Sequence, residues 1–148
     1  MAETYDIYYA LLPELQQTHG KLFSFIFQGA IGVRGPQKMV NRWLKCFMTT
    51  KGTDPTNLNY GTQFNSLFFS NVSKLKDIQD LVSVYIDDCN AQIKAFDRKY
   101  GLPPEERLQN ATLESLLPDG VDGVAIQVLL RNQANASFPL VLPTLTVT

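Results

Sequence analysis

The sequence is poor in the residues that build catalytic and metal sites. Its 148 residues include one histidine, His19, and two cysteines, Cys46 and Cys89. A Cys-His or Ser-His-Asp nucleophile would have to use His19, which lies in a predicted loop beside Gly20 and is more simply a solvated turn residue. One histidine and two separated cysteines do not supply the ligands of a typical zinc site. On predicted helices, the two cysteines indicate reduced, partly buried thiols.

Carboxylate pairs and phosphate-binding loops are also missing. Asp87 and Asp88 are adjacent on a predicted helix and point about 100° apart, so they cannot flank one substrate bond. Glu105 and Glu106 are the pair that a glycoside hydrolase could use, but acidic residues at a helix start are favoured by the helix dipole. The glycines of residues 29–35 are not followed by a Gly-Lys-Ser/Thr step. The sequence therefore predicts a protein that is not an enzyme and holds no metal or cofactor.

Long apolar runs and an excess of one charge are absent too. No apolar run reaches the roughly 20 residues that span a bilayer, and the acidic segment 1–6 lacks the pattern of a signal peptide. The net charge of -1 gives no basic excess to follow a phosphate backbone. Lys38, Arg42 and Lys45 cluster on one predicted helix, and such a group is most often a solvated face. We therefore expect neither a membrane nor nucleic acid as the main partner.

The sequence does have enough apolar residues for a core, and an aromatic N-terminal segment. Hydrophobic residues make up 45% and charged residues 18%, which is typical of a globular protein. Residues 4–12 are rich in strand formers, and residues 21–28 alternate as a half-buried strand does. We expect residues 1–35 to form an extended arm or loose hairpin that needs a surface to lie against. Its candidate partner-binding residues include Tyr5, Tyr9, Phe23 and Phe25.

Helical periodicity dominates residues 36–100. Pro36 fits the first turn of a helix that ends near Thr50, and Gly52 fits its C-terminal cap. The apolar face expected for this helix comprises Met39, Val40, Trp43, Phe47 and Leu44. A short helix is expected at about 63–69. The clearest element is a helix from about residue 71 or 72 to Tyr100, stopped by a glycine and two prolines. Its candidate N-caps are Ser70, Asn71 and Ser73. Its predicted apolar stripe, most simply part of a protein core, comprises Leu75, Ile78, Val82, Tyr85, Cys89, Ile93, Phe96 and Tyr100.

The apolar period changes to two after the long helix. Alternating stretches lie at 113–117, 124–131 and 138–147, with turn-rich segments at 118–123 and 132–137. They predict an antiparallel three-stranded meander packed on the long helix, so the expected fold class is α+β.

The last predicted strand carries no charge. Residues 132–148 contain no charged side chain, whereas natural sheets usually protect an open edge with lysines, bulges or short strands. Pro139 and Pro143 partly protect it, because each removes a backbone donor. From the residues alone, this strand either pairs with another chain or packs against its own sheet.

The loop between the two helices resembles a known family. The segments FMTTKGTDP at 47–55 and YGTQFNSL at 60–67 resemble the small baseplate wedge proteins of contractile phage tails. That family shows an apolar helix end, a Thr-x-x-Gly turn, a proline, a (Phe/Tyr)-Gly-(Ser/Thr) step and an apolar helix, followed by a long helix and a β-meander. The resemblance covers about residues 36–148, which are the expected core, and leaves the arm of residues 1–35 outside it.

The resemblance implies a sheath initiator of the virion baseplate, assembled in the host cytoplasm. About six copies would surround the tail tube, with sheath subunits, baseplate wedge proteins and the tube as neighbours. Each copy would offer edge strands to the first ring of sheath subunits. The residues implied to join the augmented sheet lie in Val124–Arg131 and Phe138–Val147 and include Val124, Ile126, Val128, Leu130, Phe138, Leu140 and Leu142. The residues implied to shape the loop are Gly52, Pro55, Tyr60 and Gly61.

One motif departs from the family, and other functions stay open. The Glu-Pro-Arg-like triplet that follows the long helix in many members corresponds here only to PEER at 104–107. Type VI secretion systems use a related baseplate protein. The alternative function is therefore another virion or type VI secretion adaptor at the junction of tube and baseplate, of the tail-completion class. An unrelated soluble binding module is a further alternative.

Overall fold

The computed structural model describes residues 35–69, 74–119 and 123–146. The predicted aromatic arm, with Tyr5, Tyr9, Phe23 and Phe25, lies outside these residues, as do the three candidate N-caps of the long helix and the last residue of the predicted strand, Val147. The described elements are α2 (Pro36–Met48), the 3-10 helix η1 (Phe64–Phe69), α3 (Leu75–Tyr100), the 3-10 helix η2 (Pro104–Glu106), β1 (Leu108–Asp119), β2 (Gly123–Asn132) and β3 (Ser137–Thr146).

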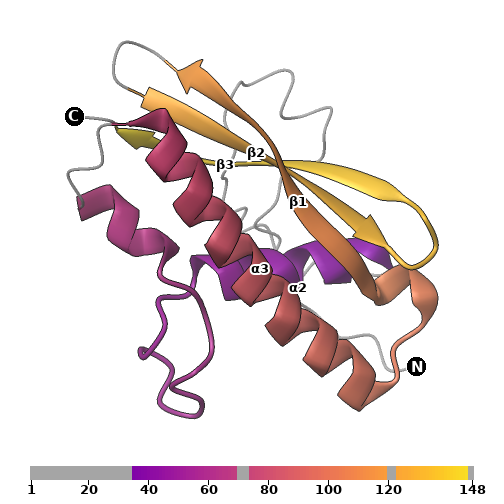
Figure 1. Ribbon diagram of the computed structural model, residues 1–148. Coiled ribbons are helices and arrows are strands. Elements are labelled where there is room, and N and C mark those ends of the chain that lie inside the picture. Colours follow the sequence, from indigo (N-terminus) through magenta and orange to yellow (C-terminus); the bar gives the residue numbers. More distant parts are fainter. Residues whose placement is uncertain (1–34, 70–73, 120–122, 147–148) are drawn as a thin grey trace, which may run out of the picture.

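The architecture is a three-stranded antiparallel sheet backed by helices. The strand order is β1-β2-β3, with β2 in the centre. Figure 1 shows α2 and α3 on one side of the sheet, crossing each other, and α3 packs mainly against β1. The predicted α+β class and the meander on the long helix are confirmed. The first strand is longer than predicted, since it begins at Leu108 rather than at residue 113.

Helix α2 supplies the aromatic centre of the core. Its first residue is Pro36, whose fixed φ suits a first helical turn. The Trp43 and Phe47 rings stack with centroids 4.9 Å apart, and the ring of Phe64 from η1 lies 4.6 Å from that of Phe47. All three side chains are fully buried. The predicted apolar face of this helix is confirmed, because Met39, Val40, Trp43, Leu44 and Phe47 are all buried.

Helix α3 departs from the predicted stripe at both ends. It begins at Leu75, and Leu75, Phe96 and Tyr100 are each more than two-fifths exposed. From Ile93 the core-facing position advances by four residues to Asp97 rather than by three to Phe96, which a repeat of 3.6 residues per turn permits. Its buried apolar residues are Ile78, Val82, Ile86, Cys89 and Ile93.

Hydrogen bonds of the residue Gly61 hold the loop between α2 and η1. Lys51 N–H donates to Thr62 O at 3.0 Å, and Thr62 N–H donates to Thr49 O at 2.9 Å. Gly61 lies inside this turn with φ of 101°, and both its N–H and its C=O are bound by the side-chain amide of Gln92 on α3, at 3.0 and 2.9 Å. A Cβ at residue 61 would lie 2.3 Å from Thr49 O. The loop therefore requires glycine at this position.

The two cysteines lie on the facing helices α2 and α3. Both are free thiols with no exposed surface, so they are more deeply buried than predicted. The Cys89 thiol donates to Trp43 O at 3.4 Å, and the Cys46 thiol donates to Gln92 Oε1 at 3.4 Å. Burial raises the pKa of Cys89 well above its usual range. Cys89 is therefore a neutral core residue.

We predict that Gly61→Ala destabilises the protein much more than Gly52→Ala. Both glycines have positive φ, but a Cβ at Gly52 meets nothing within 4 Å. Gly52→Ala should cost about 1 kcal/mol of strain, whereas Gly61→Ala adds a clash with backbone and should cost about 3 kcal/mol or more. Urea denaturation of the two variants tests this difference, and equal losses of stability would contradict the described turn.

Candidate functional site: the two edges of the sheet

The phase of the hydrogen-bond ladder decides which backbone groups face outward. Antiparallel strands alternate between residue pairs that exchange two backbone hydrogen bonds and pairs that exchange none. Asn132 N–H donates to Ala136 O at 3.0 Å at the end of the β2–β3 hairpin, so this pair is of the bonded type. The β2–β3 register is unbroken from there to Ile126–Leu142. Even-numbered residues of β2 therefore point their backbone groups at β3, and odd-numbered ones point theirs at β1.

This phase fixes the free backbone groups of both edge strands. The outer edge of β3 carries the backbone groups of residues 137, 139 and 141, which lie opposite odd-numbered residues of β2. The outer edge of β1 carries those of residues 108, 111, 113, 116 and 118, which lie opposite even-numbered ones. These two rows of donors and acceptors are the groups with which another strand could pair.

Side chains of α3 cover the first half of the β1 edge. Leu108 N–H donates to Asp97 Oδ2 at 2.8 Å, and the Asn90 side-chain amide donates to Ala111 O at 2.9 Å. Both backbone groups are among those assigned to the outer edge, so the contacts agree with the ladder phase. Asn90 and Asp97 are 4% and 3% exposed. Another chain cannot take their place without displacing α3.

Asn90 also joins α2 to this edge. Its Oδ1 accepts from Trp43 Nε1 at 3.0 Å, and its Nδ2 also donates to Asn110 Oδ1 at 3.0 Å. One buried amide thus connects the central tryptophan of α2 with the backbone and a side chain of β1. A buried amide that is fully bonded fixes the orientation of the elements it connects.

Asp97 is held at the junction of α2, α3 and β1. Burial raises the pKa of Asp97 above its usual range, while the Leu108 N–H and the Arg42 guanidinium oppose that rise. Arg42 Nη2 lies 3.2 Å from Asp97 Oδ1 and also donates to Glu106 O. Lys38 Nζ lies 4.0 Å from Glu106 Oε1. The carboxylate of Asp97 therefore stays in a buried position because two donors from different elements, the Leu108 N–H of β1 and the Arg42 guanidinium of α2, bind its two oxygens.

The predicted solvated face of α2 is wrong for two of its three cations. Lys38 and Arg42 are each in ion-pair contact with a buried carboxylate from η2 or α3. Their side chains are each only 19% exposed. Only Lys45 is exposed, as the prediction requires. Two of the three cations, Lys38 and Arg42, therefore connect α2 to η2 and α3 through ion pairs.

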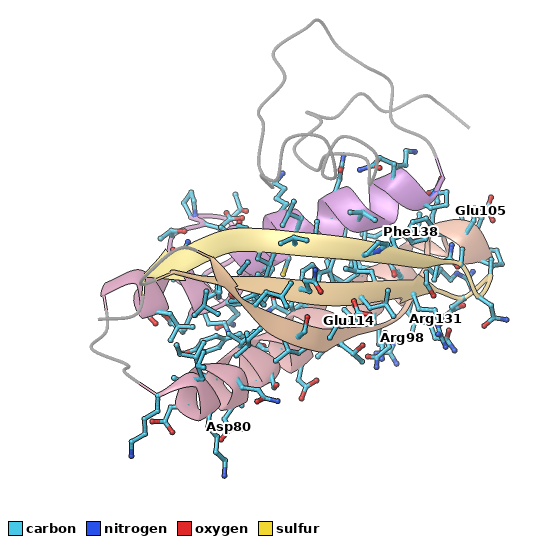
Figure 2. All side chains as sticks on the ribbon, turned by 90° about the horizontal axis from the view of Figure 1, so that it is seen from above. Asp80, Arg98, Glu105, Glu114, Arg131 and Phe138 are labelled. Atoms are coloured by element: carbon cyan, nitrogen blue, oxygen red, sulfur yellow. The ribbon has the colours of Figure 1, made fainter. Side chains whose placement is uncertain are left out.

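The β3 edge differs from the β1 edge. Within the described residues, β3 pairs with β2 alone. Figure 2 looks onto the sheet, with β3 along one edge and β1 along the other, beside α3. The C=O of Phe138 points at β2, so the nitrogen of Pro139 points away from it, because the two ends of a trans peptide face opposite ways. Pro143 follows Leu142 and lies in the register irregularity between the pairs Ile126–Leu142 and Val124–Leu145. Before Pro143, the donors that face outward on this edge of the described strand are Ser137 and Val141.

The structure narrows the predicted partner-binding set. β2 is bonded on both sides and has no free edge, so Val124–Arg131 belongs to the sheet but cannot pair directly with a further strand. The buried members of the set are Val124, Ile126, Val128, Leu130, Leu140 and Leu142. Phe138 is half-buried against the same core. Their side chains fill the core, and what stays available for pairing is the backbone of β3.

The predicted loop residues take separate places. Gly61 is fixed as described above, and the half-buried Tyr60 packs against the core. Gly52 has φ of 91° at the turn after α2, and Pro55 is exposed beyond it. Asp54 accepts hydrogen bonds from the N–H and hydroxyl of Thr56, which lowers the pKa of Asp54.

The carboxylates considered for chemistry do not converge. Glu105 is exposed, while Glu106 is 5% exposed and turned toward Lys38. The described parts of the chain hold no group of three or more His, Cys, Asp or Glu residues placed to bind a metal ion. Among the described helices, none is both long and apolar enough to cross a membrane.

Neither a family model nor a curated protein sequence matches this chain.

Sequence reasoning missed Asn90 and Asp97. Both follow a buried residue of α3 by four positions, after Ile86 and Ile93, and so occupy core-facing places. A polar residue in such a place needs a buried partner. The spacing thus marks Asn90 and Asp97 as buried polar residues, but it does not identify the groups to which they bind.

We predict that Asn90→Ala lowers the free energy of unfolding by about 3 kcal/mol. The change leaves the Trp43 indole N–H and the Ala111 C=O buried without this partner, and each lost partner costs about 1–3 kcal/mol. Gln79→Ala on the exposed face of the same helix is the control and should change stability by less than about 0.5 kcal/mol. Chemical denaturation measures both, and similar losses would show that Asn90 does not hold the β1 edge.

Proposed function

We propose that this protein is a structural component of a contractile-tail baseplate that starts the sheath by accepting a β-strand at the edge of β3. One observation carries the proposal. Within the described residues, buried polar side chains of α3 cover the first half of the β1 edge, while β3 pairs with no strand besides β2. A strand of another chain could therefore be added at the β3 edge.

The backbone of β3 suits a directional link between subunits. Each backbone hydrogen bond contributes only about 1 kcal/mol net, but a ladder repeated around a ring of subunits adds several of them. The link depends little on side chains, so it persists while subunits rotate as rigid bodies. The β1 edge cannot serve in the same way along its first half, because Asp97 and Asn90 already occupy it.

The loop that carries the family resemblance has a structural part in this proposal. The segment 47–67 is closed by the Gly61 peptide, which is bound to Gln92 on α3. Asn65 Nδ2 donates to Met48 O at 2.8 Å and so ties η1 back to the end of α2. These contacts give a physical reason for the glycine of the Tyr-Gly-Thr step, which is one of the steps that carry the resemblance.

The proposed setting follows from that likeness. The protein would lie in the virion baseplate, in about six copies around the tube, with sheath subunits at the β3 edge and wedge proteins on other surfaces. The alternative of an adaptor at the junction of tube and baseplate uses the same fold. It is distinguished by the position of the protein relative to the first sheath ring.

We predict that Val141→Pro prevents sheath assembly while the protein stays folded. Val141 supplies one of the two outward donors, with Ser137, in the stretch of β3 before Pro143, and it lies opposite Gln127 on β2. Prolines already stand two residues before and after it, so the strand tolerates a third at this phase. Electron microscopy of particles assembled with the variant should show tubes with baseplates and without sheath.

Val141→Thr is the matched control, because it keeps the N–H and the β-branched shape and should assemble normal tails. Deleting residues 138–148 is a poorer test, since it also removes Leu140 and Leu142 from the core. Normal sheath on Val141→Pro particles would overturn the proposal, provided that circular dichroism gives the variant the same fold as the wild type.

A further inference from the structure

We propose that the two prolines of β3 make its edge accept a strand of a different protein in preference to a second copy of this chain. The inference rests on the same edge as the proposed function. The preference for a foreign strand over a second copy can be measured on the isolated protein. It follows from where Pro139 and Pro143 stand in the ladder, four residues apart on either side of Val141.

Pro139 costs the sheet itself no hydrogen bond. Its nitrogen follows the Phe138 carbonyl, which points at β2, so it faces outward. The nitrogen of Pro143 likewise follows the carbonyl of Leu142, the last residue before the register irregularity of β3. Pro118 of β1 stands in the same phase, opposite Val124, with its nitrogen facing away from the sheet. All prolines of the described sheet thus occupy positions where only the outer edge loses a donor. A proline in such a position affects only the pairing of the sheet with an added strand.

A foreign strand and a second copy lose different numbers of bonds. The outward positions 137, 139 and 141, which lie in the unbroken register, would exchange about six hydrogen bonds with an antiparallel strand. A partner without proline loses one of them, because it still donates to the carbonyl of Pro139. A second copy brings a proline of its own. When Pro139 meets Pro139 of the copy, that pair exchanges no bond, so two are lost.

The difference favours a foreign strand. One net backbone bond at about 1 kcal/mol corresponds to roughly a fivefold difference in association constant. Charge does not oppose self-pairing of this segment, because residues 132–148 contain no charged side chain with which two copies would repel each other. In a ring where copies stand side by side, an edge without this discrimination would be occupied by a neighbouring copy.

The double variant Pro139→Val/Pro143→Val tests the selectivity on the full chain. It restores both outward donors, and valine is a good strand former. Light scattering after size-exclusion chromatography should find the wild type monomeric and the variant dimeric over the same concentration range, with self-association at least about 30-fold tighter, because the pair at position 139 regains both of its bonds. Pro55→Val, which changes an exposed loop proline, is the control and should leave the protein monomeric.

Hydrogen exchange of the Val141 amide locates the contact. In the double variant this amide should become protected as the concentration rises, and in the wild type it should not. The inference is overturned if the folded double variant remains monomeric, if its dimer leaves the Val141 amide unprotected, or if the wild type already pairs through this amide. Normal sheath with Val141→Pro would contradict the proposed function in sheath assembly, but it would not contradict the selectivity of the β3 edge.

Discussion

The fold depends on how the outward backbone groups of β1 are satisfied. A sheet of three strands has two edges, and each edge carries unpaired donors and acceptors. Asn90 and Asp97 of α3 bind such groups at Ala111 and Leu108, and both side chains are nearly fully buried. The same two residues contact Trp43 and Arg42 of α2. The covering of one edge and the crossing of the two helices are therefore one arrangement, fixed by two polar side chains.

Periodicity in the sequence was enough to predict the class of the fold. The apolar face of α2, the long helix ending at Gly101 and the three alternating strands each follow from residues close together in the chain. Where two faces of a helix are both partly apolar, local spacing did not decide between them, and the predicted stripe ended at Phe96 and Tyr100 instead of Asp97. Asp97 faces the core because Arg42 and Leu108 donate hydrogen bonds to it. Both residues are distant from Asp97 in the local helical spacing, so that spacing does not predict the contacts.

The candidate site was predictable in kind but not in detail. The uncharged end of the sequence pointed to the last strand, and its prolines pointed to a modified edge. Alternation does not say which of two neighbouring residues faces the core, so side chains such as Ile126 and Leu142 were assigned to a partner although they fill the interior. The positions of the backbone groups became clear only from the register of the whole sheet.

The unequal edges give the molecule a polarity. A sheet that is open on both sides can be extended without limit, as in a fibril, and every member is then equivalent to every other. A sheet closed along part of one side by its own helix offers that side a shorter stretch for pairing than the other, so a strand added to it meets two unequal edges. The placement of two side chains on α3 thereby makes the two edges of the described sheet unequal.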